Sequence, residues 1–244
     1  MPESREKIRA VVFDLDDTLY AERDYVLSGY RAVARQLGLS GPEAGGDRLA
    51  QEFEAWLWRR FLGGQSRGAF DALNSQFRLG LDAHGIFRLV EAYRSHTPDI
   101  RPAAGVPEML GRLHARFRLA LLTDGYMPAQ QLKLDALNLR RFFDLIVFTE
   151  DLGRSAWKPA PTGFEMVQAR LQLTHESLAY VGDNPAKDFV APNRLGWLTV
   201  QVIRPGQIHA RRPAPPDGRP MAVVHSPGEL YEAILEHGRG GTPY

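Results

Sequence analysis

The stretch VVFDLDDTLY, residues 11–20, decides how the rest of this chain is interpreted. It opens with three apolar residues, which is the pattern of a strand buried on both faces of a parallel sheet. Asp14, Asp16 and Asp17 follow, and two like charges about 4 Å apart repel by roughly 4 kcal/mol at an effective dielectric constant of 20. Because open α/β sheets bind ligands at the carboxyl ends of their strands, the stretch favours a cation site there. A solvated acidic turn is the alternative interpretation of this stretch alone.

Composition bounds the size and the partners of the protein. The 244 residues, 44% of them hydrophobic and 24% charged, are enough for one domain with a real core and an insert. A formal net charge of +1 gives no field that would argue for nucleic acid or for a membrane surface. Partners must therefore be inferred from a site, and we expect a small molecule.

The absence of cysteine excludes disulfides, thiolate metal sites and cysteine nucleophiles. Residues 1–10 are charged and lack the apolar segment of a signal peptide, and no later stretch approaches the ~20 apolar residues of a transmembrane helix. We therefore expect a cytoplasmic protein.

The region after Tyr20 changes from a strand pattern to a helical one. Apolar residues recur at helical spacing in three segments, residues 25–37, 49–62 and 86–93. Glycine-rich breaks at 41–46 and 63–68 separate these segments. The pattern predicts an all-helical insert at residues 21–97, between two parts of a core formed by residues 1–20 and 98–244.

The second part of the core alternates short apolar strands with helices, which is typical of βα units that build a parallel sheet. Strands are expected at 118–122, 145–148, 178–181, 198–203 and 221–224. Helices are expected at 106–115, 128–137, 162–171 and 229–235.

Polar residues follow these strands in a recurring way. Thr123, Asp124 and Gly125 end the strand at 118–122 and offer a hydroxyl and backbone amides, as phosphoryl oxygens require. Lys158 supplies a cation after the next strand, although a surface lysine is the usual interpretation of such a residue by itself. The segment GDNPAKD, residues 182–188, adds two carboxylates at the same edge of the sheet. Each signal is weak alone.

Taken together and in this order, these residues resemble the four motifs of the haloacid dehalogenase-like (HAD) hydrolase superfamily. The resemblance covers nearly the whole chain: Asp-x-Asp-x-Thr at residues 14–18, Thr123, Lys158, and Gly-Asp-x-x-x-x-Asp at residues 182–188. It implies a Rossmann-like three-layer α/β/α sandwich, and the insert at 21–97 resembles the C1 cap of subfamily I, which would close over the site.

The resemblance also implies roles for single residues. Asp14 would attack phosphorus and form an aspartyl-phosphate. Asp16 would protonate the leaving oxygen and then deprotonate the water that hydrolyses the intermediate. Thr123 and Lys158 would bind the phosphoryl oxygens, and Lys158 would also screen Asp14 from the incoming anion.

A magnesium ion is the cofactor that the resemblance implies. Its oxygen ligands would be Asp14, the backbone carbonyl of Asp16 and Asp183, with Asp188 as a further ligand, directly or through water. Asp124 departs from the threonine-asparagine or threonine-serine pair frequent in relatives. We interpret its side chain as bonding the cap or a hydroxyl or amine of the substrate, and a structural role in the turn is the alternative.

Several activities within the superfamily are separable by chemistry. A dehalogenase does not need Asp16, a phosphonatase would need a cap lysine where residues 21–101 contain none, and ion pumps would need membrane spans. A phosphomutase of the β-phosphoglucomutase type stays open, as does a non-catalytic binding or regulatory module. We predict a Mg²⁺-dependent phosphomonoester hydrolase acting on a small metabolite, first a sugar phosphate, in a monomer or homodimer.

Overall fold

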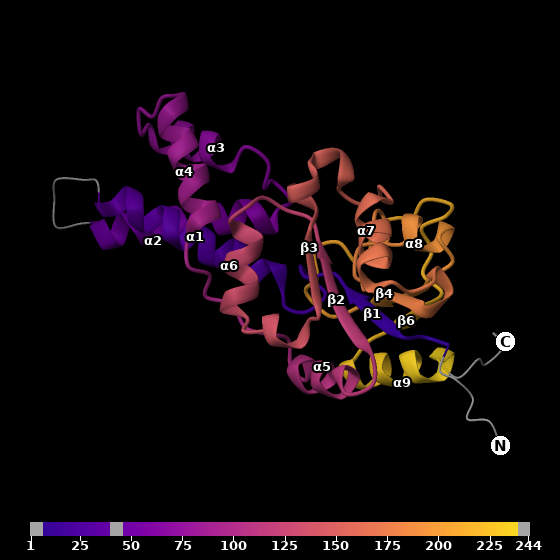
Figure 1. Ribbon diagram of the computed structural model, residues 1–244. Helices are drawn as coiled ribbons and strands as arrows, with labels where there is room; N and C mark the ends of the chain where they lie inside the picture. Colours follow the sequence, from indigo (N-terminus) through magenta and orange to yellow (C-terminus); the bar gives the residue numbers. More distant parts are fainter. Residues whose placement is uncertain (1–6, 40–45, 239–244) are drawn as a thin grey trace, which may run out of the picture. The chain divides into compact units, whose positions relative to one another are not determined.

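A parallel β-sheet of six strands organises the larger part of the chain. The computed structural model describes residues 7–39 and 46–238, and its strands stand in the order β3-β2-β1-β4-β5-β6 (Figure 1). The strands are β1 (Ala10–Phe13), β2 (Arg118–Thr123), β3 (Leu145–Phe148), β4 (Leu178–Gly182), β5 (Leu198–Val202) and β6 (Ala222–Val224). Every pair of neighbours is parallel.

Strand β1 lies in the middle of the sheet because all four of its residues are apolar and buried. Val11 is level with Leu119 of β2 on one side and with Ala179 of β4 on the other. The chain adds β2 and β3 on one side of β1 and then β4, β5 and β6 on the other. The strand order therefore reverses beside β1 and β4, which is the position at which open α/β sheets form a ligand crevice.

Helices cover both faces of the sheet. Helices α5 (Val106–His114) and α9 (Pro227–Gly238) lie on one side, and α7 (Thr162–Leu171) and α8 (Val190–Arg194) lie on the other (Figure 1). Three-residue and four-residue 3₁₀ turns complete the connections, at Arg140–Phe142, Thr149–Leu152, Arg154–Ala156 and His175–Ser177. The predicted Rossmann-like three-layer architecture is confirmed.

An aromatic group fills the layer between the sheet and α7. The Phe164 ring lies edge-on to Tyr180 at 4.9 Å and to Trp197 at 5.6 Å, measured between ring centroids, and all three side chains are fully buried. Such edge-to-face pairs add about 0.5–1.5 kcal/mol each beyond the area that they bury. These contacts fix β4, the strand that carries Tyr180, against α7.

A second compact unit is helical throughout. It comprises Arg23–Ile100 and Met127–Ala136, and the other unit comprises Met1–Glu22, Arg101–Tyr126 and Leu137–Tyr244. The helices of the second unit are α1 (Glu22–Leu39), α2 (Gly46–Leu62), α3 (Ala69–Phe77), α4 (Ala83–Ser95) and α6 (Ala129–Ala136). Helix α6 groups with this unit although it lies within residues 98–244, which the sequence assigns to the core. The division into catalytic core and cap stays a prediction.

The helical unit has its own core. Buried apolar residues from four helices form it, among them Val33, Phe53, Leu57, Leu73 and Leu89. The predicted break at 63–68 is present, with Gly64 and Gly68 at positive φ. Residues 41–45 of the other predicted break lie outside the described residues. No helix in the described ranges is both long and apolar enough to cross a membrane.

Candidate active site

The nucleophile candidate, Asp14, directly follows β1. Its backbone N–H donates to the Val181 carbonyl at 2.9 Å, which continues the β1–β4 ladder by one residue and fixes where the side chain begins. The side chain is buried, and the Thr18 hydroxyl donates to Asp14 Oδ2 at 3.3 Å. Asp14 is thus held at the carboxyl end of the central strand, where the strand order reverses.

Lys158 lies against Asp14 with its ammonium group buried. Lys158 Nζ is 2.5 Å from Asp14 Oδ1, 2.9 Å from Asp188 Oδ1 and 2.9 Å from the Tyr180 hydroxyl oxygen. Burial alone would lower the pKa of Lys158, but the carboxylates of Asp14 and Asp188 outweigh it and raise that pKa well above its usual value. Lys158 is therefore a fixed positive charge beside the nucleophile candidate.

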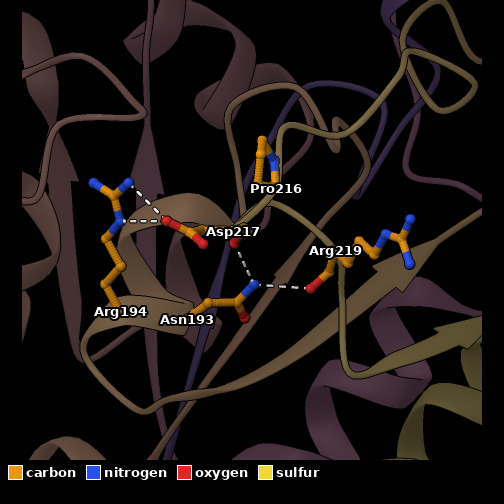
Figure 2. Close-up of a pocket in the computed structure, with 5 residues that line it drawn as sticks. All are labelled: Asn193, Arg194, Pro216, Asp217 and Arg219. Carbon is orange, nitrogen blue, oxygen red and sulfur yellow. Dashed lines mark hydrogen bonds and ion pairs between the residues drawn. The ribbon is translucent and has the colours of Figure 1, made fainter.

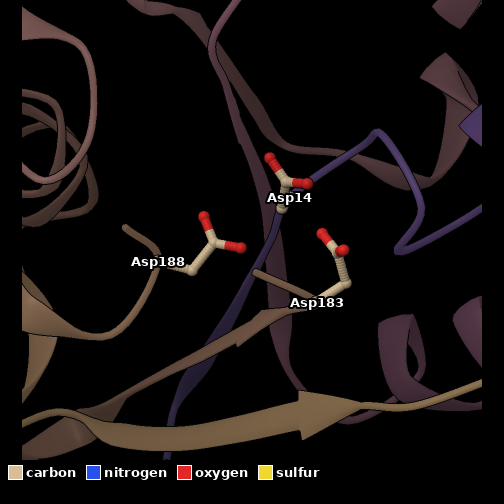
Figure 3. A group of neighbouring side chains, drawn as sticks. All are labelled: Asp14, Asp183 and Asp188. Atoms are coloured by element: carbon tan, nitrogen blue, oxygen red, sulfur yellow. The ribbon is translucent and has the colours of Figure 1, made fainter. Parts of the chain in front are cut away.

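Three carboxylates meet at the ends of β1 and β4. Asp14, Asp183 and Asp188 each offer an oxygen atom, and these atoms all lie within 4.8 Å of one another (Figure 3). Asp188 Oδ2 accepts the backbone N–H of Asn184 at 2.9 Å and so closes the loop that carries Asp183. A Cβ atom on Gly182 would stand 2.7 Å from that same Oδ2, so the glycine is needed for the loop to close.

The electrostatics of this acidic cluster favour a cation. Burial, only partly offset by Lys158, raises the pKa of Asp14 from 3.8 to about 6. Burial and then the charges of Asp188 and Asp14 raise the pKa of Asp183 well above its ordinary value. Asp183 Oδ2 is buried without a hydrogen-bond partner among the described residues. An orphaned oxygen within a set of carboxylates fits a hard divalent cation, which takes oxygen ligands.

The other two acids of residues 14–18 turn in different directions. Asp16 is half-buried, and its carboxylate accepts a hydrogen bond from the Tyr20 hydroxyl. Asp17 has a φ of 56° and its carboxylate accepts the backbone N–H groups of Glu22 at 2.9 Å and Ile208 at 2.6 Å. The two hydrogen bonds tie Asp17 to two other segments, but the repulsion among the acids persists, since burial and then the charge of Asp16 raise the pKa of Asp17.

The residues at the end of β2 lie at the carboxyl end of the sheet, and the Asp124 carboxylate bonds to residues of the sheet unit. Thr123 is buried at the last position of β2, and Gly125 has a φ of 141°. Asp124 is 7% exposed. Its Oδ1 accepts hydrogen bonds from the Thr149 hydroxyl at 2.9 Å and from the Lys158 backbone N–H at 3.2 Å. Its Oδ2 contacts Lys187 Nζ at 3.0 Å. These donors support the structural alternative for Asp124, and its expected contact with the cap or a substrate stays a prediction.

Sequence reasoning assigned no role to three residues of this site. Tyr180 lies within an apolar run, so nothing distinguished its hydroxyl from core material. Thr149 and Lys187 are brought to Asp124 only by the fold. Lys187 carried one usable signal, since it belongs to the segment 182–188 and the chain has only four lysines.

A separate pocket of about 290 Å³ lies elsewhere on the sheet unit (Figure 2). It is lined by Asn193, Arg194, Pro216, Asp217 and Arg219. Arg194 pairs with Asp217 at 2.7 Å, and Asn193 donates to the carbonyls of Asp217 and Arg219. These groups satisfy one another, and none of the predicted site residues borders this pocket.

Comparison with known proteins identifies the class. The family described as haloacid dehalogenase-like hydrolase matches residues 11–202, and the chain belongs to this family. A glyceraldehyde 3-phosphate phosphatase of Methanopyrus kandleri is 28% identical over 238 residues, covering 94% of this chain and 98% of the relative. A phosphoserine phosphatase of Thermus thermophilus is 27% identical over 258 residues, covering 93% and 98%.

Solved structures also match this chain over nearly its whole length. The magnesium-bound HAD-hydrolase YfnB of Bacillus subtilis matches with a TM-score of 0.67 at 24% identity, over 94% of this chain and 99% of that one. The predicted family and fold class are therefore confirmed. The chain is a HAD-like hydrolase, and the relatives from Methanopyrus kandleri and Thermus thermophilus are named as phosphatases of glyceraldehyde 3-phosphate and of phosphoserine.

Proposed function

We propose that this protein hydrolyses the phosphomonoester of a small metabolite, with Asp14 as the nucleophile and Mg²⁺ as the metal. The observation that carries the proposal is the pairing of Asp14 with Lys158 at 2.5 Å inside a cluster of buried carboxylates. A carboxylate that is fixed, screened by a cation and aimed from the end of a central strand has what an in-line attack on phosphorus needs.

In the first step an Asp14 oxygen attacks phosphorus while the bond from phosphorus to the ester oxygen breaks. Asp16, two residues further on, gives its proton to the departing oxygen. The Tyr20 hydroxyl that donates to the Asp16 carboxylate restricts the direction in which this side chain points. The products of the step are an alcohol and a phosphoryl group on Asp14.

In the second step a water molecule attacks the phosphorus of the aspartyl-phosphate. Asp16, now ionised, accepts the proton of that water, and the bond between phosphorus and the Asp14 oxygen breaks. Inorganic phosphate leaves, and both carboxyl groups return to their starting state. Thr123 would donate its hydroxyl to a phosphoryl oxygen, and the Lys158 cation beside Asp14 would keep that carboxylate oriented throughout.

The metal would be held by Asp14 and Asp183, with the Asp16 backbone carbonyl as a further ligand. Asp188 has one oxygen on Lys158 and the other on the Asn184 backbone, so we assign it to positioning these groups or to binding through water. When bound, Mg²⁺ supplies positive charge that neutralises the negative charge developing on phosphoryl oxygens.

The substrate class is a small phosphorylated compound, with sugar phosphates tested first. The relatives named for glyceraldehyde 3-phosphate and phosphoserine support a compact substrate. A mutase would share the first step and differ in passing the phosphoryl group to a sugar hydroxyl in place of water.

The test is phosphate release from sugar, triose, amino-acid, nucleotide and polyol phosphates, with Mg²⁺ or with a chelator. Asp14→Asn is compared with Asp99→Asn, a matched change at a side chain that is 78% exposed. We expect metal-dependent release that falls at least 10³-fold in Asp14→Asn, because the covalent step is lost. Asp99→Asn should match the wild type.

Two results would contradict the proposal. Unchanged turnover in Asp14→Asn would exclude the aspartyl-phosphate, and no release from any compound, including an activated aryl phosphate, would favour the binding module. Isomerised sugar phosphate without free phosphate would identify a mutase.

A further inference from the structure

The ammonium group of Lys158 is largely taken up by groups of the protein itself. A lysine ammonium carries three N–H donors. Three oxygen atoms lie within 3 Å of Lys158 Nζ, one each from Asp14, Asp188 and Tyr180. The side chain is also 1% exposed, and its contacts to Asp14 and Tyr180 are hydrogen bonds. A second, more exposed cation would therefore add to the binding of the phosphoryl oxygens.

Lys187 lies beside the same groups and is open on one side. Its Nζ contacts Asp124 Oδ2 at 3.0 Å, which is its one hydrogen bond among the described residues, and its side chain is 34% exposed. Burial and the charge of Lys158 would lower the pKa of Lys187, but the carboxylates of Asp188, Asp124 and Asp14 outweigh them and raise it. Lys187 is therefore near the nucleophile candidate and has donors to spare.

Asp124 fixes where Lys187 stands. One carboxylate oxygen accepts the backbone N–H of Lys158, and the other contacts the ammonium of Lys187. Asp124 also directly follows Thr123, whose hydroxyl is a phosphoryl ligand in the proposed function. The carboxylate thus places the Lys187 ammonium next to the position that Thr123 and Lys158 define, which explains why an acid is tolerated beside an anion site.

We propose that Lys187, held by Asp124, is a second cation, in addition to Lys158, that contacts the phosphoryl group of the substrate and of the product phosphate. The inference rests on the proposed phosphatase function and adds a binding residue and its positioning partner to it. The contact is made to the phosphoryl group, which all substrates share. Lys187 therefore contributes to affinity for every phosphomonoester and does not select among leaving groups.

The first test measures inorganic phosphate as a ligand, so that it does not depend on turnover. Phosphate is titrated calorimetrically into the wild type, Lys187→Gln and Lys187→Arg in the presence of Mg²⁺, with Lys7→Gln as the matched loss of an exposed lysine. A charged hydrogen bond of ~1.5–3 kcal/mol corresponds to a roughly 10-fold to 100-fold weaker affinity in Lys187→Gln. Lys187→Arg should recover most of that loss, and Lys7→Gln should bind as the wild type does.

Kinetics provide a second readout where a substrate is found. The KM of Lys187→Gln should rise by a similar factor for all substrates, including an aryl phosphate, with the leaving-group preference unchanged. Wild-type phosphate affinity in a folded Lys187→Gln variant would overturn the inference. A wild type that binds phosphate but hydrolyses nothing would overturn the proposed function while leaving the Lys187 contact to be decided by the titration.

Chemical labelling tests the wild-type protein itself, in case the variant does not fold. Limited acetylation followed by mass spectrometry compares Lys187 with Lys7, with and without saturating phosphate. We expect phosphate to slow the labelling of Lys187 at least fivefold and to leave Lys7 unchanged. Equal labelling of Lys187 in both conditions would overturn the inference.

Discussion

At the scale of single residues, burial of the Asp14 carboxylate costs folding free energy at neutral pH, and this cost can be measured. Asp14 has an ordinary pKa of 3.8 and a pKa of about 6 in the folded protein, chiefly because it is buried. The folded state therefore holds a proton on Asp14 that the unfolded state has released between these values. The contribution of Asp14 to the free energy of unfolding is therefore highest below about pH 4. It falls as the pH rises to about 6, and it stays at its low value above that pH.

Asp14→Asn removes this titration while it keeps the shape of the side chain. We expect the metal-free variant to be more stable than the metal-free wild type at pH 7.5, by on the order of 2 kcal/mol. The difference should disappear near pH 4. Urea unfolding of both proteins across this range measures it, and Asp99→Asn should show no such trend. A variant that is less stable than the wild type at pH 7.5 would mean that attraction to Lys158 outweighs burial.

The sequence indicated where Asp14 and Lys158 lie in the fold, but it did not reveal the hydrogen-bond partners of Asp17 and Asp124. A side chain directly after a buried strand is placed by the sheet, and the pattern of apolar residues predicts the sheet. The partners of Asp17 and Asp124 come from remote segments, Ile208 and Lys187 respectively. No local pattern could reveal these pairings, because each exists only after the loops have met.

At the scale of elements, the strands and most helices were predictable, but α3 and α8 were not. Strand β3 and helix α7 match their expected ranges, since a fully apolar run and a clear helical period define them. Helix α8 has five residues, too few for a helical period to stand out. Helix α3 was missed although it has nine residues, as many as α5, which was predicted. The grouping of α6 with the helical unit was also missed, because it depends on packing between segments far apart in the chain.

Close packing of α7 on the sheet makes Gly163 sensitive to substitution. A Cβ at Gly163 would stand 2.8 Å from Leu122 Cδ1 and 3.3 Å from Thr149 Cγ2, so a buried neighbour must move. We expect Gly163→Ala to destabilise the protein by about 1–3 kcal/mol. Because Thr149 also bonds Asp124, phosphate affinity should fall with it.

Gly111 in α5 is the matched control for this prediction. A Cβ there would lie 3.8 Å from Phe142 Cε1, an ordinary contact, and the position is exposed. Gly111→Ala should therefore stabilise the protein by up to about 1 kcal/mol, since alanine favours a helix over glycine. Thermal unfolding of both variants measures whether each substitution raises or lowers the stability. Equal effects would show that helix propensity, and not packing, governs both positions.

At the scale of the whole molecule, the site is a property of the folded chain alone. Asp14 and Lys158 are 144 positions apart, and Asp183 comes later still. In the unfolded state these groups are dispersed, so a ligand of the acidic cluster binds the folded state selectively and stabilises it by mass action. Metal binding and unfolding are consequently linked, and the linkage can be measured whether or not a substrate is known.

Mg²⁺ should raise the melting temperature of the wild type, and a chelator should reverse the change. At a hundredfold excess over its dissociation constant a ligand adds ~2.7 kcal/mol, which for a chain of this size corresponds to a rise of about 5–10 °C. Asp183→Asn replaces an acid whose buried Oδ2 has no hydrogen-bond partner among the described residues, and should lose most of the rise. Asp99→Asn should keep it. A melting temperature indifferent to Mg²⁺ in the wild type would contradict the proposed metal site, whereas a full rise in Asp183→Asn would place the ion on other oxygens of the cluster.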